Sequence, residues 1–335
     1  MTLYYRPLVL SDPTQDAVPL AGGPHWFREV AVLQRGGPTQ IVPALDVPPA
    51  TLARLTAPRA AVAGLTMDCA RVMGILNVTP DSFSDGGDHA DPDAAVARAL
   101  AMQQDGAEII DIGGESTRPG AVTVPETQEI DRTAPVIAAI RAQSDVAISV
   151  DTRKSAVAQA AIAAGASMVN DVAAFSYDPA LADVTAASGL PVCLMHAQGD
   201  PATMQNNPVY DDVLLDVYDF LNARIAQAEA AGIAREAIVV DPGIGFGKTQ
   251  DHNLILLRNL SLFHALGCPI LLGASRKRFI GTIGGGQDAK DRVAGSVAVA
   301  LYAVSQGVQI LRVHDTFATK QALALAAAIS GTNSR

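Results

Sequence analysis

From residue 71 to residue 330 the chain alternates short apolar runs with segments of helical composition, eight times without a break. The apolar runs consist mostly of Val, Ile, Leu and Met, as expected of strands buried on both faces of a parallel sheet. Eight strand–helix units in about 260 residues predict an α/β protein with a (β/α)8 TIM barrel. An open doubly wound sheet is the alternative, but no nucleotide-binding fingerprint favours it.

The predicted strands are 72–78, 108–112, 147–150, 168–171, 192–196, 238–240, 270–272 and 310–314. The predicted helices are 92–104, 125–143, an Ala-rich helix ending before Gly165, 179–187, 210–231, 291–305 and 316–330. In such a barrel the polar residues at the carboxyl ends of the strands converge on one face, which is where the active site is built.

Residues 1–68 differ from the rest and are predicted to be a short N-terminal extension to a barrel domain of residues 69–335. Two Gly-Gly-Pro sequences separate strand-like runs near 27–33 and 41–42, and 51–65 has helical composition interrupted at Pro58. No cluster of ligand-type residues occurs here. The extension is expected to pack on the barrel or on a partner subunit, and its role is unknown.

The formal net charge of −10 argues against a nucleic-acid-binding protein and against a polybasic membrane-surface protein. No apolar run is long enough to span a bilayer, and the first residues do not resemble a signal peptide. The three cysteines are far apart and form no CxxC pair, so they are expected to stay reduced in a cytoplasmic protein. Any anion site in so acidic a chain must be built locally.

Asp151, Asn170 and Asp241 follow the third, fourth and sixth predicted strands. Taken singly, each could equally be a helix cap. Together at one barrel mouth, their carboxylate and amide groups suit a flat heterocycle that carries several N–H donors. The glycine-rich segment 243–249 has the wrong spacing for either a phosphate loop or a dinucleotide fingerprint.

Basic side chains follow the last two strands. Arg276 and Lys277 come after the seventh strand, and Arg312 and His314 lie at the end of the eighth. Phosphate sites in this fold often lie beside strands seven and eight, so these side chains indicate a phosphorylated or otherwise anionic ligand.

The ends of the first and fifth predicted strands carry side chains that could also contact a ligand or a metal ion. Asn77 ends the first strand, beside Asp and Ser residues, and its amide oxygen could bind Mg²⁺ shared with phosphate oxygens. Met195 and His196 end the fifth strand. Both could be ordinary core residues, or Met195 could form part of a pocket wall against a ring.

Five motifs in order give the chain a recognisable pattern, and it resembles the dihydropteroate synthase family over residues 71–330. The motifs are ILNVTPDSFSDGG (75–87), GGESTRPG (113–120), DPGIGFGK (241–248), SRK (275–277) and RVHD (312–315). The resemblance implies an alkyl- or aryl-transferring enzyme of folate biosynthesis. That family joins 6-hydroxymethyl-7,8-dihydropterin diphosphate to 4-aminobenzoate and releases diphosphate.

The resemblance also implies roles for residues at the matching positions. The pterin diphosphate site would comprise Asn77, Thr117, Asp151, Asn170, Met195, Asp241, Lys277, Arg312 and His314, with Arg312 stacked on the ring. The aminobenzoate site would comprise Thr117, Arg118, Pro119, Phe246, Ser275 and Lys277. The groups implied to act in catalysis are Lys277, Asp151, Arg312 and His314, with Mg²⁺ bound by Asn77 as the cofactor.

The residue types suit this chemistry. Diphosphate is a good leaving group once cations neutralise its developing charge, and an arylamine needs no strong general base, so positioning and electrostatics would carry the reaction. The loops after the first two strands are expected to close over the site. The resemblance also implies a homodimer paired through helices far from the mouth. A pterin-binding methyltransferase-type barrel and a non-catalytic pterin-binding paralogue remain as alternatives.

Overall fold

The computed structural model describes residues 2–79, 92–116, 121–199 and 203–331. Within these residues eight parallel strands form one sheet, in the order β10-β9-β8-β7-β6-β5-β12-β11. The strands are β5 (Arg71–Asn77), β6 (Ile109–Gly113), β7 (Ala147–Asp151), β8 (Met168–Asp171), β9 (Val192–Met195), β10 (Ile238–Asp241), β11 (Leu271–Leu272) and β12 (Ile310–Val313).

The sheet closes into a barrel where its two outer strands meet. A single parallel bridge, Val240 to Ile270, joins β10 to the start of β11, and the amide of Val240 donates to the carbonyl of Pro269 at 3.0 Å. Every other pair of neighbouring strands is joined by two to five paired residues. The seam between β10 and β11 is therefore the least hydrogen-bonded part of the barrel. Closure confirms the predicted (β/α)8 fold.

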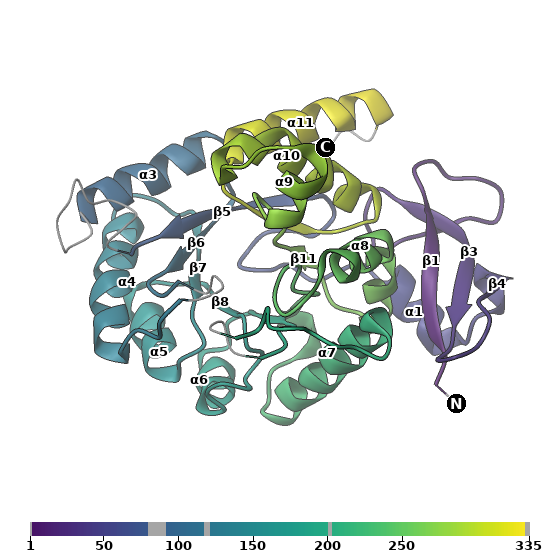
Figure 1. Cartoon of the computed structure of the whole chain (residues 1–335), viewed down its shortest axis with the longest axis horizontal. Coiled ribbons are helices and arrows are strands. Elements are labelled where there is room, and N and C mark those ends of the chain that lie inside the picture. Colours follow the sequence, from purple (N-terminus) through teal and green to yellow (C-terminus); the bar gives the residue numbers. More distant parts are fainter. Residues whose placement is uncertain (1, 80–91, 117–120, 200–202, 332–335) are drawn as a thin grey trace.

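Helices surround the barrel on its outer side (Figure 1). They are α3 (Pro92–Gln104), α4 (Glu126–Arg141), α5 (Ser155–Ala164), α6 (Ala180–Ser188), α7 (Val213–Ala230), α8 (Gln250–Arg258), α9 (Arg278–Gly284), α10 (Val293–Ser305) and α11 (Thr316–Ser330), with 3-10 turns η2 (Arg235–Ala237), η3 (Leu260–Leu266) and η4 (Ala289–Arg292). Local signals set several boundaries. The Asp212 carboxylate caps α7 by accepting from the amides of Leu214 and Leu215, and Gly165 ends α5 in the left-handed conformation.

The N-terminal segment forms a small antiparallel sheet beside the barrel (Figure 1). Its elements are β1 (Tyr4–Leu10), β2 (Val18–Pro19), β3 (Trp26–Leu33), β4 (Gln40–Pro43), the turn η1 (Ala44–Asp46) and α1 (Pro49–Thr56). Tyr4 donates to Asp219 of α7 at 2.9 Å, and Ser261 of η3 donates to the carbonyl of Pro7 at 2.9 Å. The segment thus contacts the outer face of the barrel on the α7–η3 side.

Residues just before β5 fill the amino-terminal end of the barrel. Val62 and Met67 are 0% and 2% exposed and belong to the same apolar cluster as Met73, Ile109 and six other strand residues. These apolar side chains form a stopper that excludes water from the lower part of the barrel interior.

Several predicted boundaries shift. The predicted helix 51–65 ends at Thr56, because Ala57 and Pro58 leave the helical conformation, and the predicted start of α7 at 210 moves to Val213. The helix α8 was missed, although Thr249 and His252 form a capping box at its start. The division into an extension of 1–68 and a domain of 69–335 remains a prediction. No helix in the described ranges is long and apolar enough to cross a membrane.

Candidate active site

The carboxyl ends of four adjacent strands place polar residues in one row. Asn77 pairs in register with Gly113, Gly113 with Asp151, and Asp151 with Asn170, across β5, β6, β7 and β8. Gly113 leaves space beside Asp151, since the Cβ of any other residue there would lie 3.4 Å from the Cβ of Asp151. The expectation that strand ends converge on one mouth therefore holds for Asn77, Asp151 and Asn170.

Arg312 on β12 reaches across the mouth and joins this row. Its Nε donates to Asp111 Oδ2 at 2.6 Å, and its Nη2 donates to Asp151 Oδ2 at 2.7 Å. Asn170 Nδ2 also donates to Asp111 Oδ2, at 3.2 Å. The Asp111 side chain is fully buried, whereas that of Arg312 is 20% exposed. The Arg312 side chain, held by two carboxylates, thus remains partly accessible.

Burial and charge shift the acidities of this group in opposite directions. Burial raises the pKa of Asp151 to about 7, although Arg312 opposes the shift. Burial alone would lower the pKa of Arg312, but Asp111 and Asp151 outweigh it and raise the pKa above its usual value. Arg312 is therefore a permanent cation, and Asp151 is an acceptor whose charge depends on pH near neutrality.

Asp241 lies on the other side of the barrel, in register with Met195 of β9. Its Oδ1 accepts from the amide of Gly243 at 2.7 Å, which curls the loop after β10 back over the strand end. Burial raises the pKa of Asp241, and this hydrogen bond opposes the shift. A Cβ at Gly273 would lie 3.6 Å from Asp241 Oδ2 and 3.9 Å from Arg312 Cδ, so a glycine leaves the space between them open.

Lys277, the residue before α9, faces the same loop. Its Nζ donates to the carbonyl of Ile244 and lies 4.4 Å from the centre of the Phe246 ring. Burial lowers the pKa of Lys277 to about 7; the Asp241 carboxylate raises it and Arg312 lowers it further. Lys277, Phe246 and Asp241 thus form the β10–β11 side of the mouth, as the sequence predicted for their positions.

A second lysine, Lys248, holds this loop from inside. Its Nζ donates to the carbonyls of Gly243 at 2.8 Å and Phe246 at 3.0 Å, and it lies 2.8 Å from His196 Nδ1. Burial lowers the pKa of His196 well below its usual value, and the nearby Lys248 lowers it further, so His196 is a neutral acceptor. Its role here is structural: it supports the loop that carries Phe246.

The ends of β11 and β12 are joined to each other. Ser275 Oγ accepts from the amide of His314 at 3.2 Å and lies 3.1 Å from His314 Nδ1. Arg276 Nε donates to Asp315 Oδ2 at 2.9 Å. Arg276 is therefore engaged by Asp315, and of the basic residues expected beside these strands Lys277 and Arg312 face the mouth.

Some predicted site residues lie outside the described residues. They are Thr117, Arg118, Pro119 and all but the start of the loop 79–87. Among the residues that are described, no three His, Cys, Asp or Glu side chains converge as a metal site. Asn77 is half-buried at the end of β5, with a side-chain oxygen as its only metal-binding atom.

Sequence reasoning missed Asp111, Lys248 and Glu115. Asp111 interrupts the otherwise apolar run of β6, and a charged residue inside a buried strand was the signal that could have found it. Lys248 is the last residue of the glycine-rich DPGIGFGK motif, and no role was predicted for it. Glu115 lies within GGESTRPG, and its partners come from another strand–helix unit, which no local pattern reveals.

Comparisons with known proteins agree with this geometry. The family model described as "Pterin binding enzyme" matches residues 73–314. The dihydropteroate synthase of Escherichia coli (strain K12) is 48% identical over 75% of this chain and 89% of its own length. The dihydropteroate synthase of Xanthomonas albilineans, solved with 4-aminobenzoic acid, is 49% identical with a TM-score of 0.76, covering 81% of this chain and 98% of that one. Its complex with 7,8-dihydropteroate is 47% identical with a TM-score of 0.74 at the same coverage.

The fold and the mouth define a barrel enzyme built to hold a pterin. The chain belongs to the pterin-binding enzyme family and, within it, to the dihydropteroate synthases, which are transferases. The matched region begins after the N-terminal sheet.

Proposed function

We propose that this chain joins 6-hydroxymethyl-7,8-dihydropterin diphosphate to 4-aminobenzoate, giving 7,8-dihydropteroate and diphosphate. The observation that carries the proposal is the placement of Arg312 between the buried carboxylates of Asp111 and Asp151, with Asn170 in the same network. Relatives of high identity were solved with 4-aminobenzoic acid and with 7,8-dihydropteroate, the second substrate and the product of this reaction.

The pterin would lie on the mouth between the two halves of the barrel. Asp151 and Asp241 accept its ring N–H donors, and Asn170 both donates and accepts. Arg312 would stack its guanidinium on the ring, while Met195, 3% exposed beside Asp241, would close the apolar side. The bridging carboxylates hold that guanidinium in place, so little ordering remains to be done when the ring binds.

The diphosphate would lie toward β5, β11 and β12, near Asn77, Arg312 and His314, with Thr117 as a further contact. As the C–O bond to diphosphate breaks, Arg312 and His314 stabilise the negative charge that develops on the leaving oxygen. The electron-rich dihydropterin spreads the positive charge left on its methylene carbon. Each such charged contact contributes roughly 3–4 kcal/mol to lowering the barrier.

A Mg²⁺ ion is proposed to accompany the diphosphate. Asn77 alone would supply one protein oxygen. This suits Mg²⁺, which takes most of its ligands from phosphate and water. When bound, Mg²⁺ would add charge neutralisation to the leaving group.

The aminobenzoate would enter beside Lys277, Phe246 and Ser275, with Thr117, Arg118 and Pro119 completing its site. The arylamine nitrogen attacks the methylene carbon as diphosphate leaves, and the amine then loses one proton to solvent. A pKa of about 7 lets Lys277 pair with the aminobenzoate carboxylate without paying the full cost of a buried charge before substrate binds.

The test is a two-substrate assay. We expect diphosphate and dihydropteroate only when the pterin diphosphate, 4-aminobenzoate and Mg²⁺ are all present. Absence of product from folded protein would overturn the proposal. Pterin binding without product would instead support a non-catalytic pterin-binding protein, and methyl transfer from a methylated pterin would support the methyltransferase alternative.

We also infer a homodimer that pairs through helices far from the mouth. Phe317, Leu325 and Ile329 lie on one face of α11 and are 60%, 61% and 78% exposed, and Tyr302 of α10 is 41% exposed. Large apolar side chains gathered on one helix face are typical of a subunit interface. Sedimentation should give a dimer, and Leu325→Asp should give a monomer.

We also propose a cytoplasmic location. Cys193 and Cys268 are buried and form no disulfide in the described part of the chain, which suits a reducing compartment. Fractionation of cells that express the chain would test this.

A further inference from the structure

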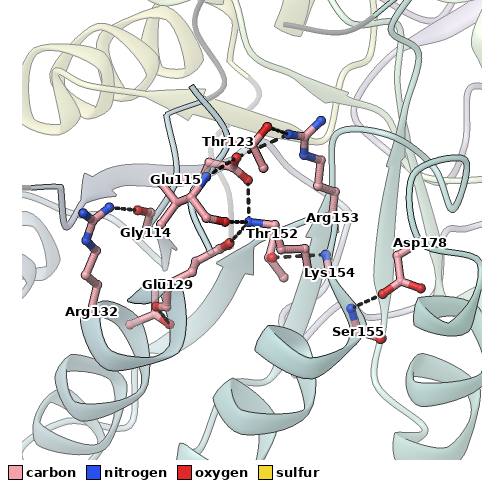
Figure 2. Close-up of polar contacts among 12 residues, drawn as sticks. Gly114, Glu115, Thr123, Glu129, Arg132, Thr152, Arg153, Lys154, Ser155 and Asp178 are labelled. Carbon is pink, nitrogen blue, oxygen red and sulfur yellow. Dashed lines mark hydrogen bonds and ion pairs between the residues drawn. The ribbon is translucent and has the colours of Figure 1, made fainter. Parts of the chain in front are cut away.

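The connection between β6 and α4 is held at both of its described ends by one group of charged side chains (Figure 2). Glu115 is the second residue after β6, and Val124 lies two residues before α4. Glu115 Oε1 accepts from the amide of Val124 at 3.1 Å. The side chain at the start of this connection therefore binds the main chain at its end.

The next strand–helix unit supplies the cations that complete the group. Lys154 Nζ lies 3.0 Å from Glu115 Oε2 and 2.6 Å from Glu129 Oε2, and it donates to the carbonyl of Val124 at 2.6 Å. Figure 2 shows Lys154 pointing into the space between the two glutamates. One ammonium thus holds the start of the connection, its end and the first turn of α4.

Arg153 forms a second connection between the two ends of the segment. Its Nη2 lies 3.3 Å from Glu115 Oε1 and 3.2 Å from Thr123 Oγ1, and its guanidinium lies 3.9 Å from the centre of the Tyr177 ring. The side chains of Glu115, Arg153 and Lys154 are 4–7% exposed. Two residues directly after Thr152 therefore hold both ends of a connection that belongs to a different unit.

The burial of this group sets it apart from an ordinary loop anchor. Glu115, Glu129, Arg153 and Lys154 balance in charge, and taking them out of water is costly unless the geometry is well satisfied. Burial alone would lower the pKa of Lys154, but its hydrogen bonds to Glu129 and Glu115 raise it. Lys154 therefore keeps its charge, and the ends of the connection are fixed by buried ion pairs that solvent screens little.

The position of the group links it to the site. Thr117, Arg118 and Pro119, which are proposed to contact aminobenzoate, lie between its two ends in sequence. Arg153 and Lys154 follow Asp151, the carboxylate bound by Arg312, by two and three residues. We propose that Glu115 is a positioning residue that fixes the β6–α4 connection against the β7–α5 turn and so sets the affinity for 4-aminobenzoate. This inference rests on the proposed function.

Glu115→Gln tests it against a matched control at the other end of β6. Glu108 immediately precedes β6 and also bridges two cations, Arg71 at 2.8 Å and Lys320 at 3.1 Å. In Glu115→Gln we expect the KM for 4-aminobenzoate to rise about 10-fold or more and the KM for the pterin diphosphate to change less than about 2-fold. Glu108→Gln should leave both constants unchanged.

Hydrogen exchange gives a readout that needs no activity. The amide of Val124 should exchange faster in Glu115→Gln than in the wild type or in Glu108→Gln. If Glu115→Gln fails to fold, Thr123→Val, at an exposed position, removes only the Arg153 link and should raise the KM for 4-aminobenzoate by about 2- to 3-fold.

The outcomes separate this inference from the function on which it rests. An active wild type with an unchanged aminobenzoate KM in folded Glu115→Gln would overturn the positioning role alone. Equal changes in both KM values, or equal changes in Glu108→Gln, would reduce Glu115 to a residue that only stabilises the fold. A wild type that makes no dihydropteroate would overturn the proposed function, and the positioning role with it.

Discussion

Arg71 and Arg312 lie on adjacent strands, β5 and β12, and each guanidinium contacts two carboxylates. Arg71 contacts Asp68 at 3.0 Å and Glu108 at 2.8 Å at the amino-terminal end of the barrel. Their own exposures are similar, 17% for Arg71 and 20% for Arg312.

The two arginines differ in their partners. Asp68 is 65% exposed and Glu108 is 21% exposed, whereas the partners of Arg312, Asp111 and Asp151, are 0% and 6% exposed. Bridging two carboxylates therefore does not by itself mark a functional arginine. What distinguishes Arg312 is that the protein has buried the carboxylates, at an energetic cost, where a ligand can reach the guanidinium.

The largest expected effect is that of Arg312→Met. It leaves two buried carboxylates without their cation, so we expect a loss of about 3–5 kcal/mol in the free energy of unfolding and at least about 10³-fold in kcat/KM. Arg71→Met is the control and should cost no more than about 1 kcal/mol, with kcat/KM unchanged. Urea unfolding measures the stability and the diphosphate assay measures kcat/KM. Equal losses in the two variants would show that burial of the partner carboxylates does not distinguish Arg312 from Arg71.

Lys277→Ala should lower kcat/KM by at least about 10²-fold, because it removes a cation that is proposed to contact substrate. The free energy of unfolding should not fall, since burial lowers the pKa of Lys277 and its charge therefore does not stabilise the native state. Lys290→Ala, at an exposed position in η4, is the matched control and should retain full turnover. A fully active Lys277→Ala variant would refute the assigned role.

The two ends of the barrel can also be compared through methionines. Met67 in the stopper and Met195 at the mouth are 2% and 3% exposed. Each Met→Ala change should lower the free energy of unfolding by about 2–4 kcal/mol through the cavity it leaves. Only Met195→Ala should raise the KM for the pterin diphosphate. A similar rise in Met67→Ala would show that the stopper also shapes the mouth.

The smallest expected effect is a pH dependence of about 10-fold in pterin affinity. The pKa of Asp151 is about 7, and only its carboxylate form accepts two ring N–H donors, so affinity should rise as pH increases through 7. A raised pKa also means that the native state binds this proton more tightly than the unfolded chain. The contribution of Asp151 to stability is therefore fully present below about pH 4 and is lost as pH rises through about 7.

Calorimetric titration of the pterin at several pH values measures this dependence. Asp151→Asn should bind more weakly and with a flat profile between pH 6 and 8. A wild-type profile that is equally flat would contradict the assignment.

Much of the fold was visible in the sequence because each strand–helix unit carries its own local signals. These signals affect only the residues next to them in the sequence. They are the apolar runs, the glycine after α5 and the polar residues that end β7, β8 and β10. The placement of Asp151, Asn170 and Asp241 at one mouth then followed from the barrel rule. Their roles remain proposals.

What the sequence did not reveal depends on partners far apart in the chain. Asp111 matters because Arg312, 201 residues later, donates to it. Val62 and Met67 fill the barrel although both lie outside its helices and strands. Arg276 is a basic residue beside a strand end, as a contact to an anionic ligand would be, but it forms an ion pair with Asp315. Patterns along the chain cannot show such pairings, since tertiary packing alone decides them.

The seam between β10 and β11 has a mechanical consequence. One bridge closes it, and the loop with Phe246 follows β10 while Ser275 and Lys277 follow β11. The residues proposed to contact aminobenzoate therefore lie on both sides of the strand pair that would break the fewest hydrogen bonds on separating. Asp151 and Asn170, which are proposed to contact the pterin, lie on strands joined by three paired residues. The barrel is therefore least reinforced between β10 and β11, beside the proposed aminobenzoate contacts.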